Sequence, residues 1–141
     1  MNLTKEKYSN HALCREMLQT ADVVRRFDPS CVEDALKVKP DAKRIFLTGE
    51  GSSRIFPAKN AIRTTLSNAC QVFPFTEGGT QAMDYDLQDC LVLGASNSGK
   101  TKEVIRLFHQ LKGQGHSGLL SLMAHEDTPL QALSATGHVL Q

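Results

Sequence analysis

Hydroxyl-bearing and glycine residues are concentrated directly after an apolar run in the second half of the chain. The run Leu91-Val-Leu leads into Gly94-Ala-Ser-Asn-Ser-Gly-Lys-Thr101, and an amphipathic segment follows from Lys102 to Phe108. A turn of this composition between a strand and a helix directs backbone N–H groups, hydroxyls and the positive end of the helix dipole at one place. The sequence therefore predicts a binding site for a phosphate group.

A nucleotide is one candidate ligand for this turn. Residues 94–101 match the nucleotide-binding pattern G-x-x-x-x-G-K-[ST], with Lys100 as the lysine. The chain has 141 residues, so only 40 follow Thr101, fewer than most nucleotide-binding cores need. Asp127 also lies beyond the end of the next apolar run, where a carboxylate is poorly placed to anchor Mg²⁺. These features disfavour the nucleotide.

A phosphomonoester that is held without being transferred is the other candidate. The hydroxyls of Ser96, Ser98 and Thr101 and the N–H groups of residues 98–101 can surround a phosphate without Mg²⁺ or a lysine. The structural alternative is a helix start that is capped by its own Ser or Thr side chain.

A second turn of the same kind occurs earlier in the chain. Gly49-Glu-Gly-Ser-Ser53 follows the apolar run of residues 44–48. Parallel strands place their carboxyl ends at one edge of the sheet, and ligands bind outside that edge. Two hydroxyl-rich turns that each follow a strand are therefore expected to converge on one anion.

Apolar runs and helical patterns alternate along the chain. Strands are expected at residues 44–48, 71–75, 90–93 and 118–123 and from 138, and helices at 4–27, 30–36, 55–66, 100–111 and 128–133. This alternation is typical of a parallel sheet covered by helices. We expect an α/β fold, a three-layer α/β/α sandwich with a mostly parallel, five-stranded sheet. Because the fifth strand begins at the end of the chain, the sequence is interpreted as a piece truncated at its C-terminus.

Composition excludes several classes of function. A formal net charge of +1 gives no electrostatic reason to bind nucleic acid or an acidic membrane. No apolar run is long enough to span a bilayer, and the first residues are polar. The four cysteines are widely spaced and the five histidines scattered, which predicts reduced thiols, a cytoplasmic location and no metal site.

Several segments resemble the sugar isomerase (SIS) domain family. Residues 96–103 resemble its S-x-S-G-x-T-x-E motif, and residues 49–53 its G-x-G-[ST]-S turn after the first strand. Residues 75–77 and 128–130 resemble two shorter segments of the family, so the resemblance spans residues 43–141. Residues 14–20 are similar to the segment before the first of two SIS domains in aminosugar-phosphate and tagatose-6-phosphate isomerases, although Ala21 replaces its proline. We therefore expect an N-terminal helical segment, residues 1–40, packed on a SIS domain, residues 41–141.

The resemblance implies roles for particular residues. It assigns the sugar phosphate to Ser96, Asn97, Ser98, Gly99 and Thr101, and substrate contact from the first turn to Gly51, Ser52 and Ser53. Glu77 is a candidate general base, since aldose–ketose isomerisation moves a proton between adjacent carbons. A glutamate before two glycines is, however, more often an exposed turn residue.

The resemblance also implies an activity. It suggests part of an aldose–ketose isomerase acting on a hexose or aminohexose 6-phosphate, with no metal or organic cofactor. The family's acid–base groups lie in a second SIS domain or beyond the fifth strand, so this piece alone is expected to be inactive. It is expected to form a homo-oligomer or to pair with a second SIS domain. The alternative is a non-catalytic sugar-phosphate sensor.

Overall fold

The computed structural model describes residues 5–139. The chain divides into two compact units, Met1–Pro29 and Ser30–Leu140. The first unit contains α1 (Glu6–Ser9) and α2 (Ala12–Arg26). The expected single helix of residues 4–27 is thus interrupted around Asn10 and His11. The predicted packing of residues 1–40 on the domain stays a prediction.

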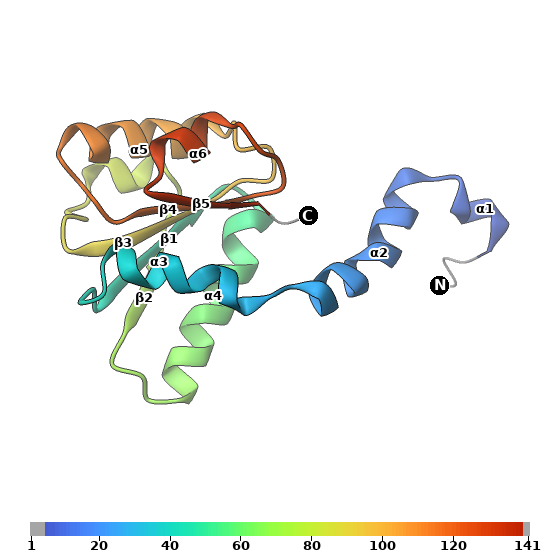
Figure 1. The fold of residues 1–141 in the computed structure, drawn as a ribbon, viewed down its shortest axis with the longest axis horizontal. Coiled ribbons are helices and arrows are strands. Elements are labelled where there is room, and N and C mark those ends of the chain that lie inside the picture. Colours follow the sequence, from blue (N-terminus) through green and yellow to red (C-terminus); the bar gives the residue numbers. More distant parts are fainter. Residues whose placement is uncertain (1–4, 140–141) are drawn as a thin grey trace. The chain divides into compact units, whose positions relative to one another are not determined.

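The second unit is a layered α/β structure (Figure 1). Its strands are β1 (Arg44–Gly49), β2 (Phe73–Thr76), β3 (Cys90–Ala95), β4 (Leu119–Met123) and β5 (Thr136–Val139). Its α-helices are α3 (Glu33–Val38), α4 (Ser52–Ser67), α5 (Lys102–Gly113) and α6 (Pro129–Leu133), with 3₁₀ turns η1 (Pro29–Val32) and η2 (Gln81–Asp84).

All five strands are parallel and lie in the order β2-β1-β3-β4-β5. Each connection therefore crosses over through a helix or turn that covers a face of the sheet. The order reverses between β1 and β3, which is the switch point where ligands of such sheets bind. The five-stranded α/β/α prediction is confirmed.

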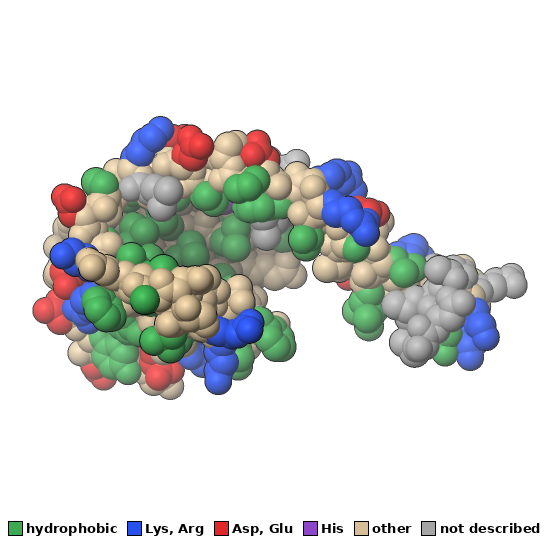
Figure 2. All heavy atoms as spheres, turned by 90° about the horizontal axis from the view of Figure 1, so that it is seen from below, with side chains coloured by type: hydrophobic (Ala, Val, Ile, Leu, Met, Phe, Trp, Pro, Cys, Tyr) green, Lys and Arg blue, Asp and Glu red, His purple; other side chains and the backbone are tan. Residues whose placement is uncertain are grey.

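Two apolar cores hold the layers together. The larger lies between the sheet and α5 and α6 and includes Phe46, Val92, Phe108 and Leu130, all with no exposed surface. The smaller lies on the opposite face, where α3 and α4 pack (Figure 1). Figure 2, which views the molecule from below, shows this side hollowed, with hydrophobic side chains on the floor of the hollow.

Helix α4 begins earlier than expected. It starts at Ser52, whereas the sequence suggested Ile55, so Pro57 lies inside the helix and not in its first turn. Proline has no N–H and cannot donate to the carbonyl group of Ser53 four residues earlier.

The described helices include none that is both long and apolar enough to cross a bilayer.

Candidate functional site

The two hydroxyl-rich turns lie side by side because their strands are neighbours. β1 pairs with β3 along its whole length, and the last pair in register is Gly49 with Ala95. Each turn continues directly from one of these two residues. The expected convergence of the turns at the carboxyl edge of the sheet is therefore what the fold produces.

In the turn after β3, the N-cap hydroxyl does not cap the helix that follows, α5. Thr101 is the N-cap residue of α5 but makes no capping hydrogen bond. Its hydroxyl instead shares a 2.7 Å hydrogen bond with the hydroxyl of Ser96, which is only 3% exposed. The structural alternative, a helix capped by its own threonine, is therefore not what this turn forms, and the N-terminus of α5 stays open to an anion.

Part of the backbone of this turn is used internally. The Gly99 N–H donates to the Ser96 carbonyl at 3.1 Å, and the Lys100 N–H donates to the Ser98 hydroxyl at 3.2 Å. Two of the four N–H groups expected to face the phosphate are thus engaged within the turn. The side chains of Asn97 and Ser98 are both exposed to solvent.

Gly99 joins this turn to the turn after β4. Its φ is +62°, and an added Cβ would lie 2.3 Å from the Thr128 hydroxyl. Its carbonyl accepts a hydrogen bond from the Leu130 N–H at 3.2 Å, and the Asn97 carbonyl accepts one from the Ala124 N–H at 3.1 Å. The buried Thr128 side chain in turn caps α6 by accepting from the Gln131 N–H. Only glycine fits this position, so Gly99 shapes the turn.

The turn after β1 also leaves a helix end uncapped. Gly51 is the N-cap of α4, with φ +56° and ψ −133°, and no side chain caps this helix. This backbone conformation is essentially restricted to glycine. Gly51 and Ser52 are exposed, whereas Ser53 is half-buried. Two uncapped helix N-termini therefore open at the same edge of the sheet.

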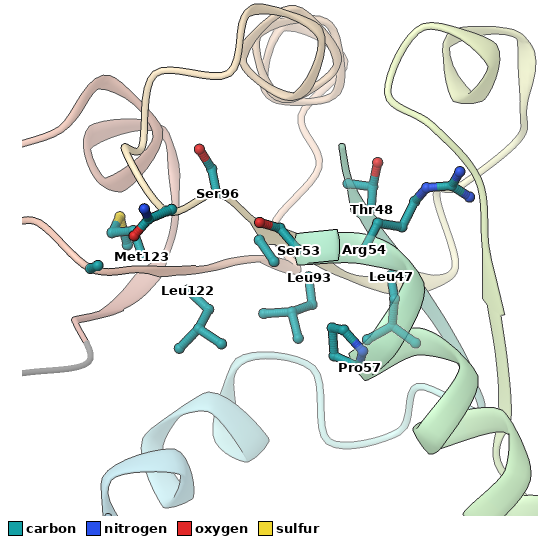
Figure 3. Close-up of a pocket in the computed structure, with 12 residues that line it drawn as sticks. Leu47, Thr48, Ser53, Arg54, Pro57, Leu93, Ser96, Leu122 and Met123 are labelled. Atoms are coloured by element: carbon teal, nitrogen blue, oxygen red, sulfur yellow. The ribbon is translucent and has the colours of Figure 1, made fainter. Parts of the chain in front are cut away.

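A cavity of about 190 Å³ lies between the ends of β1, β3 and β4 and the start of α4. Three predicted residues line it: Ser53, Ser96 and Asn97. Figure 3 shows the hydroxyls of Ser96, Ser53 and Thr48 on one side of the cavity and aliphatic side chains on the other. The remaining lining residues are Leu47, Arg54, Pro57, Leu93, Ala95, Leu122, Met123 and Ala124. Ser98, Gly99, Thr101, Gly51 and Ser52 belong to the adjoining turns and do not line it.

Arg54 is a site residue that the sequence analysis missed. It lines the cavity, and its guanidinium lies beside Thr48 (Figure 3). The Arg54 Nη1 atom is 3.5 Å from Glu77 Oε1, a loose ion pair, and its buried Nε finds no acceptor among the described residues. A buried charged donor without a partner is costly. Arg54 directly follows Gly51-Ser-Ser53 in the sequence, and this position could have marked it as a candidate.

Glu77 lies next to this arginine and not in the cavity lining. Its Oε1 accepts a hydrogen bond from the Gly78 N–H at 2.8 Å, and the side chain is half-buried. Its backbone carbonyl accepts from the Thr48 hydroxyl at 3.0 Å. Glu77 therefore lies just after the end of β2, beside Arg54.

Cysteines and metal-ligating residues form no centre in the described part of the chain. Cys14, Cys70 and Cys90 are free thiols, and no group of three His, Cys, Asp or Glu residues among the described ones could hold a metal ion. Burial raises the pKa of the Cys90 thiol to about 11, which makes it a poor nucleophile. The side chain of Cys31 lies outside the described residues.

Several solved structures share this fold. A candidate phosphosugar isomerase involved in capsule formation from Bacteroides fragilis has a TM-score of 0.71 and 21% identity over 89% of this chain and 70% of its own. The protein c3406 from E. coli CFT073, solved as a complex with a ligand, has a TM-score of 0.68 and 25% identity over 91% and 68%. The sugar isomerase domain of the RpiR transcription factor from Sphaerobacter thermophilus has a TM-score of 0.65 and 15% identity over 90% and 72%.

The chain therefore has the fold of the sugar isomerase domain, and the resemblance to SIS proteins is confirmed at the level of the fold. Neither a protein-family profile nor a curated protein matches the sequence. Proteins with this fold include both an isomerase candidate and a transcription factor, so the fold by itself assigns no reaction.

Proposed function

We propose that this chain binds a sugar phosphate at the carboxyl ends of β1 and β3. The observation that supports it most is the pair of uncapped helix N-termini, of α4 and α5, that open beside one cavity. Each presents backbone N–H groups and a partial positive charge, which suit a phosphate dianion. The small net charge of the whole chain means that attraction of the anion has to be local.

Within this proposal the phosphate is held by the turn after β3. The hydroxyls of Ser96, Ser98 and Thr101, the side chain of Asn97 and the Ser98 and Thr101 N–H groups are the donors that we assign to it. Ser53 contacts the substrate from the other turn, which Gly51 and Ser52 shape. The 2.7 Å bond between the Ser96 and Thr101 hydroxyls holds both in position before a ligand arrives.

We further propose that the chain is part of a cytoplasmic aldose–ketose isomerase. Enediol chemistry needs a group that takes a proton from one carbon and returns it to the next, with no metal or organic cofactor. Glu77 is the carboxylate nearest to this role, held by Arg54 beside the cavity. Because no carboxylate or histidine of the described residues lines the cavity itself, other groups have to come from a second SIS domain or a second copy.

A non-catalytic sensor of sugar phosphates is the second candidate. It is supported by the shared fold with the sugar isomerase domain of a transcription factor. The two candidates differ in one measurable property, since an isomerase exchanges the C1 or C2 proton of its ligand with solvent. NMR spectra of the bound sugar phosphate in D₂O, recorded once the second SIS domain or second copy completes the site, would show that exchange for an isomerase and its absence for a sensor.

Ligand binding can be tested by thermal shift and calorimetry with fructose 6-phosphate, glucosamine 6-phosphate, tagatose 6-phosphate and Mg-ATP. A ligand at about one hundred times its Kd adds about 2.7 kcal/mol of apparent stability. We expect a hexose phosphate, and not Mg-ATP, to stabilise the chain. Thr101→Val should weaken that binding by about tenfold, because a charge-assisted hydrogen bond is lost.

Lys100→Ala is the matched control in the same turn. Lys100 is exposed and is not needed to hold a phosphomonoester, so the variant should bind like the parent chain. Stabilisation by Mg-ATP alone, abolished by Lys100→Ala, would contradict the proposal and favour the nucleotide.

A further inference from the structure

The cavity beside the phosphate turn has two chemically different sides. Ser96 and Ser53 present hydroxyls on one side, whereas Leu93, Leu122 and Pro57 line the other (Figure 3). A ligand that reaches from the phosphate turn into this cavity therefore meets aliphatic carbon over much of its surface.

The apolar side follows from the register of the sheet. Side chains alternate between the faces of a strand, and Leu47 pairs with Leu93 in the β1–β3 ladder. Leu122 pairs with Ala95 one strand further on, so all four side chains share the face that also carries α3 and α4. Leu93 and Leu122 are half-buried on this face, and both line the cavity.

An unsubstituted hexose phosphate fits this arrangement poorly. Each sugar hydroxyl placed against Leu93 or Leu122 gives up its hydrogen bonds to water without replacing them, which is unfavourable. A free amino group at C2 is worse, because it carries a charge at neutral pH. An acyl group on that nitrogen removes the charge and offers a methyl group that gains from leaving water.

We propose that this site takes an N-acyl aminosugar phosphate, with the phosphate at the turn after β3 and the acyl group against Leu93, Leu122 and Pro57. The inference rests on the proposed function, since the phosphate turn supplies the anchor that brings the sugar to the apolar side. Ser53 lines the same cavity and hydrogen-bonds the sugar hydroxyls that face it.

The test compares three ligands that differ only at C2, by isothermal calorimetry on the whole chain. They are N-acetylglucosamine 6-phosphate, glucosamine 6-phosphate and glucose 6-phosphate. We expect the N-acetyl compound to bind about tenfold more tightly than the free amine, because a charged group is kept away from aliphatic carbon and a methyl group is buried. Equal affinities for the three compounds would overturn the inference and leave the phosphate site standing. No binding by any of them, or by inorganic phosphate, would overturn the proposed function itself.

Leu93→Ser adds a second, independent readout. It should reduce the preference for the N-acetyl compound to about threefold or less, because the acetyl methyl group loses aliphatic contact and a sugar hydroxyl or amine gains a polar neighbour. Leu133→Ser is the matched control, a half-buried leucine outside the cavity, and should keep the preference of the parent chain. If Leu93→Ser instead changes the oligomeric state in light scattering and not the preference, a protein segment covers this face and the inference is wrong. If a variant does not fold, the comparison of the three ligands on the parent chain still tests the preference for the N-acyl compound.

Discussion

His116 is held as a neutral imidazole by two backbone groups. Its Nδ1 accepts a hydrogen bond from the Gly118 N–H at 3.1 Å, so the proton lies on Nε2, which donates to the Leu87 carbonyl at 2.9 Å. Burial lowers the pKa of this histidine below its usual 6.5. The unfolded chain therefore binds the proton more readily than the folded one. The folded state is fully favoured above about pH 6.5 and loses stability as the pH falls from there towards the lowered pKa.

His116→Gln is expected to flatten this pH dependence. The variant should also lose about 1–3 kcal/mol at pH 7.5, because backbone groups that the imidazole paired are left with worse partners. Urea unfolding at pH 5, 6 and 7.5 measures both effects. His109→Gln, in an exposed position of α5, is the control and should keep the pH dependence of the parent chain. An unchanged slope in His116→Gln would show that another group causes it.

At the scale of elements, Gly99 is the point where the turn after β3 meets the turn before α6. Gly99→Ala combines a positive φ with a Cβ only 2.3–2.6 Å from the Thr128 side chain. We expect a loss of about 2–4 kcal/mol of stability, because backbone strain and overpacking both contribute. Thermal unfolding measures it, and the affinity for phosphate ligands should fall because the turn has to move.

Two other glycines separate these contributions. Gly115 has a φ of +79° but nothing within 4 Å of an added Cβ, so Gly115→Ala should cost only about 1 kcal/mol for the backbone. Gly113 lies in the last turn of α5, with neither a positive φ nor a close neighbour, and Gly113→Ala should be neutral or stabilising. If Gly99→Ala loses no more stability than Gly115→Ala, the close contact with the Thr128 side chain does not contribute to the loss.

Elements were predictable from sequence where apolar runs and turn residues agree. Thr128-Pro129 was expected to start a helix and does so, with the Thr128 side chain as its cap. The start of α4 was misplaced by three residues because Pro57 was taken to mark the first turn. The N-cap at Gly51 depends on a backbone conformation, φ +56° and ψ −133°, for which residue type alone is an incomplete guide.

The candidate site was only partly predictable, for a related reason. The positions of both turns follow from strand–turn–helix order, but which hydroxyls line the cavity depends on distances that sequence does not contain. Thr101 bonds to Ser96 and not to its own helix, and Arg54 reaches the cavity and Glu77 from the first turn of α4. Lone polar residues of this kind acquire a role only through their neighbours in the fold.

At the scale of the whole molecule, the strand order determines where function can lie. With β1 and β3 adjacent, the two glycine-rich turns meet at one edge, and β2 and β4 bring Glu77 and Met123 to either side. Every residue that we assign to the site lies in the unit Ser30–Leu140. Binding and folding of this unit can therefore be examined separately from residues 1–29.

Removing residues 1–29 tests the predicted packing of the N-terminal segment. The affinity for a sugar phosphate should stay within about twofold of that of the parent chain, a difference under about 0.5 kcal/mol, because every assigned residue remains. The melting temperature should fall, since Leu13, Met17 and Val24 of α2 recur at helical spacing and each gains about 1.5–3 kcal/mol when buried on a partner surface. Calorimetry and thermal unfolding read the two effects independently. An unchanged melting temperature would show that residues 1–29 do not pack on the domain, and a lost affinity would show that they contribute to the site.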